Sequence, residues 1–233
     1  QQPRSRGLGD VYKRQPYAAV YYPSALTTNL DGTNVVVPPT HVALRTLAFN
    51  DQVAFPWFAP AGFQRGLVQN ATSVGYVDAQ GEYVSVTLNE GQRDTLYSNK
   101  INPIASFPGR GLAVFGQKTL NPTASALDRI NVARLIVYIR ERLDDIVKPF
   151  LFEPNDAITR SNAKQVVDSL LSNLVIQRGL FDFVSVCDTS NNTPARIDRN
   201  ELYIDIAIQP VKAVEFIYIP IRIQNTLGTS GSS

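Results

Sequence analysis

The sequence has few of the residues on which most enzyme chemistry depends. Its 233 residues include a single cysteine, Cys187, and a single histidine, His41. One cysteine excludes a disulfide bond within the chain, and a cysteine in an apolar Val-Ser-Val-Cys run is typical of a small buried side chain. A histidine-dependent triad or metal site would have to be built around His41, which lies at an expected helix start, where surface exposure or capping is the ordinary role. We therefore expect a protein that is not an enzyme and that needs no cofactor or metal.

Long apolar runs and methionine are also missing. No segment approaches the roughly 18 consecutive apolar residues of a membrane-spanning helix. The basic start of the chain lacks the apolar stretch of a signal peptide, so we expect no membrane insertion. Without methionine the chain has no initiator, which predicts a fragment whose missing part is N-terminal. Residues 1–15 show no periodicity and resemble translated adaptor sequence, with a natural disordered basic arm as the alternative.

The charges are nearly balanced. Lysine and arginine number 22 against 20 aspartate and glutamate residues, which leaves a net charge of +2. A protein that neutralises many phosphates needs a larger basic excess, so we expect no direct binding of nucleic acid. Apolar residues make up 44% of the chain, which is enough for a sizeable core in one large domain or in one domain and a half.

Two long helices are predicted in the second half of the chain. Apolar residues recur at three- and four-residue steps, the period of one helix face, from Arg129 to Phe150 and again from Val166 to Val175. Gly179 can take the left-handed conformation that ends the second helix. The first helix carries charged residues opposite its apolar stripe, and Asp144 and Lys148 have the spacing of an i,i+4 ion pair. The members of this charged face are Arg134, Glu141, Asp144, Asp145 and Lys148.

The acidic loop between these helices is Phe152-Glu-Pro-Asn-Asp156. Its carboxylates, Glu153 and Asp156, have residue types that serve general acid–base catalysis or cation binding. The structural interpretation is stronger, because Asn155 or Asp156 can cap the amides at the start of the second helix. A thiol nucleophile at Cys187 is likewise weaker than a buried strand end. A small hydrolase that uses Glu153, Asp156 or Cys187 is the remote alternative function.

Strands are predicted after the second helix. Residues 181–187 form one expected strand, and the alternation of isoleucines from Leu202 to Ile208 predicts another with one buried face. The segment from Val214 to Ile223 is apolar on both faces at its centre and contains Pro220. Proline is tolerated mainly at sheet edges, so this strand is expected at an edge or donated to a neighbouring subunit. Its candidate contact residues are Phe216, Tyr218, Ile221 and Ile223. Residues 227–233 are rich in Gly, Ser and Thr and predict a disordered tail.

Residues 16–120 predict a middle segment of short strands and short helices. A helix is expected from Pro39 to about Asn50, because proline is well suited to a first helical turn. A hairpin is expected where residues 101–107 and 112–115 flank the turn Pro108-Gly-Arg-Gly111. The glycines of that turn could cradle an anion, but the following helix and lysine of a phosphate-binding loop are absent. A plain hairpin turn is therefore the favoured interpretation.

Several short motifs in this order resemble the C-terminal half of contractile phage tail sheath proteins. In the second half they are the residues from Arg129 to Ile139, the acidic loop, the Val186-Cys-Asp188 strand end and the stretch from Pro210 to Phe216. Upstream, segments that begin at Val37, Pro56, Leu96 and Phe107 extend the resemblance to roughly residues 17–223. The chain departs from the family pattern at Ala133, where a second basic residue is common, and at Ala213-Val214, where Pro-Ala is common.

The resemblance implies an α+β fold in which helices pack on one side of a mixed or antiparallel sheet. It places a sheath C-terminal domain at residues 121–226, after the middle segment. By the same resemblance, the protein polymerises around a tail tube as helically stacked hexameric rings and contracts to drive the tube through the target envelope during genome ejection. Its expected partners are other copies of itself, the tube, the baseplate and the tail terminator, in a virion assembled in the host cytoplasm. The charged face of the first helix is the candidate tube-facing surface. The alternative is the sheath of a non-viral device, pyocin-like or of type VI secretion.

Overall fold

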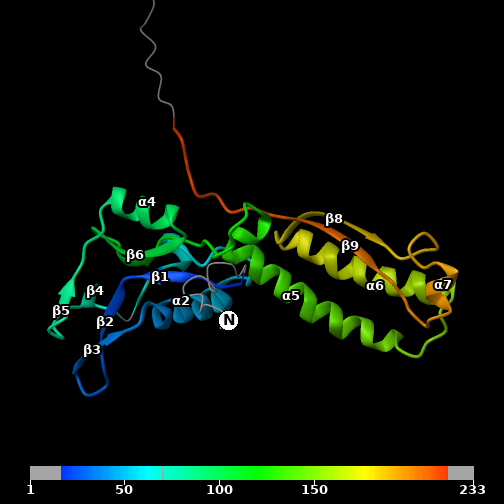
Figure 1. Cartoon of the computed structure of the whole chain (residues 1–233), viewed down its shortest axis with the longest axis horizontal. Helices are drawn as coiled ribbons and strands as arrows, with labels where there is room; N and C mark the ends of the chain where they lie inside the picture. Colours follow the sequence, from blue (N-terminus) through cyan, green and yellow to red (C-terminus); the bar gives the residue numbers. More distant parts are fainter. Residues whose placement is uncertain (1–16, 70, 220–233) are drawn as a thin grey trace, which may run out of the picture.

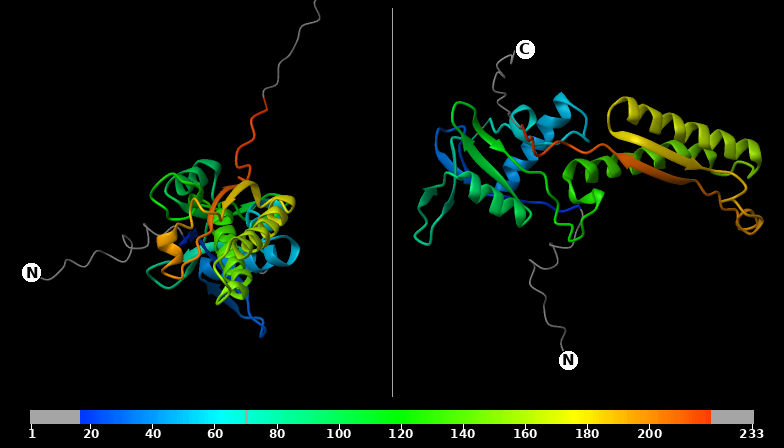
Figure 2. Two further views of the ribbon diagram at one scale, coloured as in Figure 1. Left: turned by 90° about the vertical axis from the view of Figure 1, so that its right-hand side faces the viewer. Right: turned by 90° about the horizontal axis from the view of Figure 1, so that it is seen from above.

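The computed structural model describes residues 17–69 and 71–219, arranged as two bodies along one long axis (Figures 1 and 2). The N-terminal body holds β1 to β7 with the helices between them. Its strands are β1 (Val20–Tyr22), β2 (Ser24–Thr28), β3 (Asn34–Val37), β4 (Ser73–Val77), β5 (Tyr83–Ser85), β6 (Ile101–Phe107) and β7 (Gly111–Val114). Its helices are α2 (Pro39–Val53), α3 (Gly62–Arg65) and α4 (Glu90–Ser98).

The strands of the N-terminal body form two small sheets within the described residues. β3, β2, β4 and β5 form an antiparallel sheet, while β1, β6 and β7 form a mixed sheet in which β1 runs parallel to β6. The predicted helix after Pro38 is confirmed as α2, and the predicted hairpin is confirmed as β6 and β7. Small and β-branched side chains from both sheets and α2 fill the core between them: Ala25, Val42, Val74, Ile104, Leu112 and Val114.

One buried amide ties three distant segments of the N-terminal body together. The Asn102 side chain on β6 is fully buried. Its Nδ2 donates to the carbonyl oxygens of Val20 and Lys118 at 3.0 and 2.9 Å, and its Oδ1 accepts from the Lys118 amide at 2.7 Å. Because buried backbone groups need partners, Asn102 satisfies the ends of β1 and of the segment after β7 at the same time.

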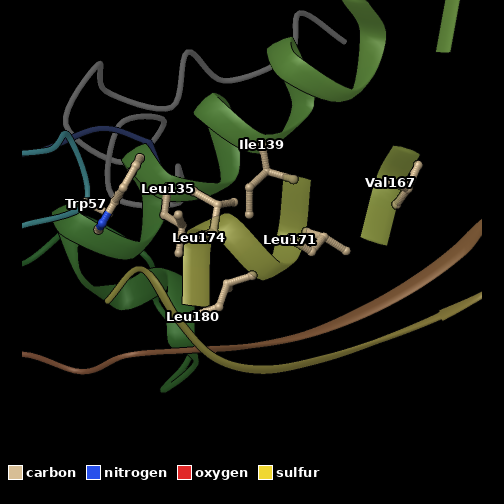
Figure 3. Close-up of a cluster of buried hydrophobic side chains, with 7 residues drawn as sticks. All are labelled: Trp57, Leu135, Ile139, Val167, Leu171, Leu174 and Leu180. Carbon is tan, nitrogen blue, oxygen red and sulfur yellow. The ribbon is translucent and has the colours of Figure 1, made fainter. Parts of the chain in front are cut away.

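The C-terminal body is built from two antiparallel helices laid on a two-stranded hairpin. After a short 3₁₀ turn, η1 (Ala126–Asp128), its elements are α5 (Ile130–Val147), η2 (Lys148–Phe150), α6 (Ala157–Ile176), β8 (Leu180–Val186), α7 (Pro194–Ile197) and β9 (Asp205–Pro210). The two predicted helices and the strand expected at residues 181–187 are confirmed, whereas the strand expected from Leu202 begins only at Asp205. Leucine-rich side chains make the core (Figure 3): Leu135, Ile139, Val167, Leu171, Leu174 and Leu180, with Ile204, Ile206 and Ile208 of β9 packed against them.

Trp57 joins the two bodies. It follows α2 in sequence, yet its ring lies in the leucine core of the C-terminal body (Figure 3). The indole Nε1 of Trp57 donates to the Gln177 carbonyl oxygen at 3.1 Å. The side-chain amide of Asn131 on α5 donates to the backbone carbonyl oxygen of Trp57 at 3.4 Å. The proline-rich segment around Trp57 is irregular, as the sequence predicts, and it carries the aromatic anchor between the bodies.

The end of α6 differs from the prediction in one residue. The left-handed residue is Arg178, with φ of 62°, and not Gly179. The amide of Gly179 donates to the carbonyl oxygen of Leu174 at 2.8 Å, and that of Arg178 donates to Val175 at 3.0 Å, the bonding pattern of a Schellman end. A Cβ on Gly179 would lie 3.1 Å from the Trp57 indole nitrogen. Glycine at this position therefore favours close packing against Trp57 and does not serve a left-handed backbone conformation.

The α+β class is confirmed, with α6 covering one face of the β8–β9 hairpin. The strands do not share one sheet, because in the described part of the chain they fall into a three-stranded, a four-stranded and a two-stranded sheet. Residues 1–15, Pro220, Ile221, Ile223 and the predicted tail at 227–233 lie outside the described residues.

Candidate assembly surface

The β8–β9 hairpin has two open edges. The strands pair antiparallel from Leu180 with Pro210 to Val186 with Asp205, with a bulge between Leu180 and Asp182. Over residues 17–69 and 71–219, no third strand pairs with either outer edge. On the face away from α6, Phe181 and Val184 are exposed. An edge that offers main-chain groups beside exposed apolar side chains is a template for an added strand.

The chain after β9 is extended and unpaired with any strand as far as Ile219. It leaves the hairpin and runs back to the N-terminal body (Figures 1 and 2). Its apolar side chains face outward, with Val214 80% exposed and Tyr218 86% exposed, and Phe216, Ile217 and Ile219 exposed to a similar degree. The structure thus shows the described part of the predicted strand outside every sheet of its own subunit. Among residues 17–69 and 71–219, no strand pairs with Phe216 or Tyr218, which are both sequence candidates.

The charged face of α5 is divided between two roles. Arg134 is not free, because its Nη2 donates to Asp51 Oδ1 of α2 at 2.7 Å and so ties the two bodies. Glu141, Asp144, Asp145 and Lys148 lie on the exposed part of the helix. The expected pair between Asp144 and Lys148 is wrong, because Lys148 Nζ instead lies 2.9 Å from Asp145 Oδ1, one position later and at i,i+3 spacing.

The acidic loop serves the start of α6. Asp156 is the N-cap residue, and its Oδ1 accepts from the Thr159 amide at 2.8 Å. This bond lowers the pKa of Asp156 below its usual value. Asn155 does not cap the helix; its Nδ2 donates to the Glu201 carbonyl oxygen at 2.9 Å, and its Oδ1 accepts from Arg160 at 3.1 Å. Glu153 is exposed on the loop beside Leu151 and Phe152.

The residues weighed for catalysis lie on separate elements. His41 is exposed on α2 in the N-terminal body, whereas Cys187 is buried after β8 in the C-terminal body, where burial raises the pKa of its thiol. In the described parts of the chain, no three His, Cys, Asp or Glu side chains group as metal ligands. No helix of the same parts is long and apolar enough to cross a membrane.

Some residues with clear structural roles escaped sequence reasoning. Glu215 and Arg129 form an ion pair at 2.6 Å although 86 positions separate them. Both lie in motifs that carry the family resemblance, but nothing in the sequence pairs one with the other. The sequence did not indicate the role of Asn102, because an amide side chain in a strand does not by itself reveal that it is buried.

Comparison with known proteins agrees with this geometry. A family model described as the phage tail sheath C-terminal domain matches residues 123–224, which run from the approach to α5 through the extended segment. The tail sheath protein of Vibrio phage KVP40 is 41% identical over 170 residues, which make up 73% of this chain and 24% of that protein. The tail sheath protein of Enterobacteria phage T4 is 35% identical with the same coverage. The chain therefore spans about a quarter of the length of these relatives.

Solved structures share the fold. The sheath complex of an extracellular contractile injection system, PVC, in its contracted state matches with a TM-score of 0.77 at 22% identity, covering 91% of this chain and 58% of that one. The contracted helical sheath of the anti-feeding prophage matches with the same score and identity, covering 94% and 58%. The chain therefore shares the fold of contractile injection-system sheaths. Residues 123–224 therefore belong to the phage tail sheath C-terminal domain family.

Proposed function

We propose that this chain is the C-terminal region of a sheath subunit that polymerises around a phage tail tube and contracts. The observation that carries the proposal combines two features of the described residues: a hairpin whose two outer edges pair with no third strand, and an extended apolar segment that pairs with no strand. A segment from one copy can add to the hairpin of the next. The copies then join head to tail, and such contacts propagate instead of closing on a dimer.

Strand addition suits a sleeve that changes shape. Main-chain hydrogen bonds join the segment of one subunit to the sheet of another, while the rest of each subunit is free to rotate. Each such bond contributes only about 0.5–1.5 kcal/mol net, so the linkage depends on several bonds together with burial of side chains such as Phe216 and Tyr218. In this proposal the subunits form hexameric rings, stacked helically between a baseplate and a tail terminator. The sleeve is assembled in the host cytoplasm, belongs to the virion tail and drives genome ejection.

The exposed part of α5 is the proposed contact with the tube. Glu141, Asp144, Asp145 and Lys148 form a polar strip on a helix that the leucine core holds rigidly from the other side. A strip of this kind lets a tube slide relative to the sheath, because exposed ion pairs contribute little each and are screened by salt. Arg134 is a weaker candidate than the other four because Asp51 already holds it.

Electron microscopy of a full-length sheath protein that carries this chain tests assembly. We expect tubular polymers from the unmodified protein. Truncation after Lys212 should abolish them and leave a soluble subunit with helical circular dichroism and cooperative melting. If the truncated protein still polymerises, the segment is not the linkage. If it loses its cooperative melting, the segment belongs to the core of its own subunit.

Charge reversal tests the tube contact. We expect Glu141→Lys, Asp144→Lys and Asp145→Lys together to spare folding, since exposed substitutions have little effect on stability, and to impair assembly on tubes. The matched control is Glu82→Lys, Glu90→Lys and Asp198→Lys, which changes net charge equally at exposed positions elsewhere. Normal extended sheath on tubes from the α5 variant at physiological salt would remove this face from the proposal.

A non-viral contractile device is the second candidate. Its support is the fold shared with injection-system sheaths, at 22–24% identity. The relatives at 41% and 35% identity are phage proteins, which favours the viral device. Purified particles that contain this sheath decide the matter, because a phage carries a DNA-filled capsid above the sheath and a non-viral device does not.

A further inference from the structure

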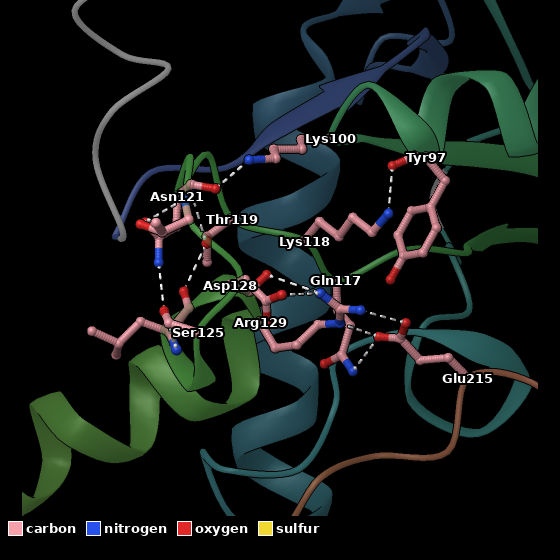
Figure 4. Close-up of polar contacts among 12 residues, drawn as sticks. Tyr97, Lys100, Gln117, Lys118, Thr119, Asn121, Ser125, Asp128, Arg129 and Glu215 are labelled. Atoms are coloured by element: carbon pink, nitrogen blue, oxygen red, sulfur yellow. Dashed lines mark hydrogen bonds and ion pairs between the residues drawn. The ribbon is translucent and has the colours of Figure 1, made fainter.

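Within the outward-facing C-terminal segment, Glu215 is the residue that is tied down by charge. Arg129 Nε donates to Glu215 Oε1 at 2.6 Å, and Arg129 Nη2 donates to Oε2 at 3.0 Å (Figure 4). The buried Gln117 side chain adds a third donor, Nε2, at 3.2 Å from Oε1. Only 16% of the Glu215 side chain and 27% of that of Arg129 are exposed. A two-point guanidinium–carboxylate contact of this kind fixes orientation as well as distance.

The partners of Glu215 are themselves held by the frame where the two bodies meet. The residue before α5, Arg129, forms a β-bridge with Lys118, and the amide of Ile130 donates to the Gln117 carbonyl oxygen at 2.8 Å. Asp128 Oδ2 lies 3.0 Å from the other terminal nitrogen of Arg129. The Arg129 guanidinium therefore cannot follow the segment if the segment moves. Its position is set by the backbone on both sides of the junction.

The electrostatics agree with a specific contact. Burial alone would raise the pKa of Glu215, but Arg129, the Tyr97 hydroxyl and the Gln117 amide stabilise the carboxylate and hold that pKa below its usual value. Figure 4 shows the Tyr97 hydroxyl pointing toward Glu215 from α4. The pKa of Tyr97 is raised, first by burial and then by the charge of Glu215. The carboxylate is thus ionised and surrounded by groups from α4, from the segment after β7 and from the start of α5.

The neighbours of Glu215 gain little from this position. Val214 and Phe216 on either side of it are 80% and 66% exposed. Residues 213–217 border a cavity of about 350 Å³ against α4 and Phe115, which they do not fill. Apolar burial therefore does not explain why the segment returns to the N-terminal body. The contact of Glu215 instead sets the direction of the segment, because this one fixed residue determines where the following apolar residues leave the subunit.

We propose that Arg129 and Glu215 form a latch that aims the C-terminal segment at a neighbouring copy of this chain. The inference rests on the proposed function, in which that segment is donated as a strand. Val211 is tied to the hairpin end by its amide, which donates to Gly179 at 3.1 Å. Because Val211 and Glu215 are both fixed, the chain between them has little conformational freedom. The apolar residues from Phe216 to Ile219 therefore leave the subunit at a defined place. Such pre-organisation lowers the entropy lost on pairing.

Trypsin cleavage after Lys212 measures the latch directly, in the isolated chain. Lys212 is exposed and lies three positions before Glu215, so a protease needs the latched stretch to leave the surface. Glu215→Gln keeps the shape and removes the charge. Loss of a hydrogen bond to a charged group shifts the equilibrium between the attached and the detached segment by about ten- to a hundredfold. We therefore expect cleavage to be about tenfold faster. Cleavage after Arg110, which is exposed in the turn between β6 and β7, is the internal reference in the same digest.

Three further variants complete the test. Arg129→Lys keeps the charge but not the two-point contact and should give an intermediate rate. The double variant Arg129→Gln with Glu215→Gln should cleave no faster than Glu215→Gln alone, since the two residues act as one contact. The control Glu201→Gln removes an exposed ion pair with Arg199 and should leave the rate after Lys212 unchanged. A rate in Glu215→Gln equal to that of the unmodified chain overturns the proposal. Should that variant unfold, the Arg129→Lys rate decides in its place.

Assembly separates this proposal from the proposed function. In a full-length sheath protein that polymerises, Glu215→Gln should raise the concentration needed for tubular polymers, while Glu201→Gln should not. Faster cleavage with unchanged polymerisation overturns the aiming role and leaves strand donation intact. If the unmodified protein does not polymerise, the proposed function fails, and the cleavage rates still decide whether Glu215 holds the segment.

Discussion

The two bodies of this molecule are stabilised in different ways. The N-terminal body consists of strands of three to seven residues in two sheets, joined by pairings between distant segments such as β1 with β6. Its core is made of alanine, valine, isoleucine and leucine side chains, and the buried amide of Asn102 links its segments. The C-terminal body consists of helices of 18 and 20 residues around a leucine core. Its hairpin adds two strands and leaves both edges without a third in the part of the chain that the structure describes.

This difference explains where assembly can take place. In the N-terminal body polar side chains satisfy the backbone internally, so its loops cannot be rearranged without stranding buried donors and acceptors. The C-terminal body obtains its stability from helix packing on one face of the hairpin. The hairpin edges are therefore not needed for the stability of this body, and they can accept a strand from another copy without weakening it.

Trp57→Ala should have the largest effect on stability, because the ring belongs to one body by sequence and to the core of the other by packing. Removal of a buried large aromatic ring destabilises a protein by about 3–5 kcal/mol. Urea unfolding of the isolated chain measures the change, with Val53→Ala at an exposed position at the end of α2 as control. The variant lacks the single tryptophan, so circular dichroism replaces fluorescence as the probe. If the two bodies unfold as one unit, it should show one transition, with a midpoint at a lower urea concentration than that of the unmodified chain. A second, unshifted transition would show that the bodies are independent.

Asn102→Ala should come next and should act through the N-terminal body. It leaves the Val20 and Lys118 carbonyl oxygens and the Lys118 amide without their side-chain partner. An unsatisfied buried polar group costs about 1–3 kcal/mol. Hydrogen exchange should locate the loss in β1 and β6, while the amides of α6 stay protected. Asn99→Ala, at an exposed amide, is the control and should change little. Uniform loss of protection across both bodies would contradict the distinction drawn between them.

Asp156→Ala should have a smaller effect, confined to the first turn of α6. The carboxylate accepts from one amide there, and Asp156→Asn should largely preserve the cap because asparagine caps equally well. The pKa of Asp156 is lowered in the folded chain. Its contribution is therefore present above the unfolded-state pKa of about 3.9 and is lost as the pH falls through the lower folded value. Urea midpoints of the Ala variant and the unmodified chain should converge in that acidic window and differ at neutral pH.

Lys148→Ala should have the smallest effect, close to none. Its ion pair with Asp145 is exposed on both sides, and such pairs contribute little to stability. An unchanged urea midpoint, measured beside that of Lys164→Ala on the partly covered pair with Asp168 of α6, would leave the polar face of α5 free for a partner. A large loss of stability in Lys148→Ala would instead show that this face maintains the fold of the C-terminal body.

The helices and the strand alternation were predictable because their periods are local. The apolar steps of α5 and α6 and the alternating isoleucines of β9 encode which face is buried, whatever the partner is. The Gly179 prediction failed for a physical reason: the geometry of the helix end required a left-handed residue at Arg178, while the approach of Trp57 required a missing side chain one position later. Sequence alone does not distinguish these two demands on glycine.

The sequence by itself determined the secondary structure, the amphipathic faces, the shortage of catalytic residue types and the resemblance to tail sheath proteins. All of these depend on residue identity at short spacing. Only the tertiary structure decided which distant residues meet: Trp57 with the leucine core, Asp51 with Arg134, and Arg129 with Glu215. Such contacts depend on the path of the chain between the partners, and that path is set by the packing of the whole molecule. The open edges of the β8–β9 hairpin belong to the same category, because a strand is known to be an edge only once its neighbours are in place.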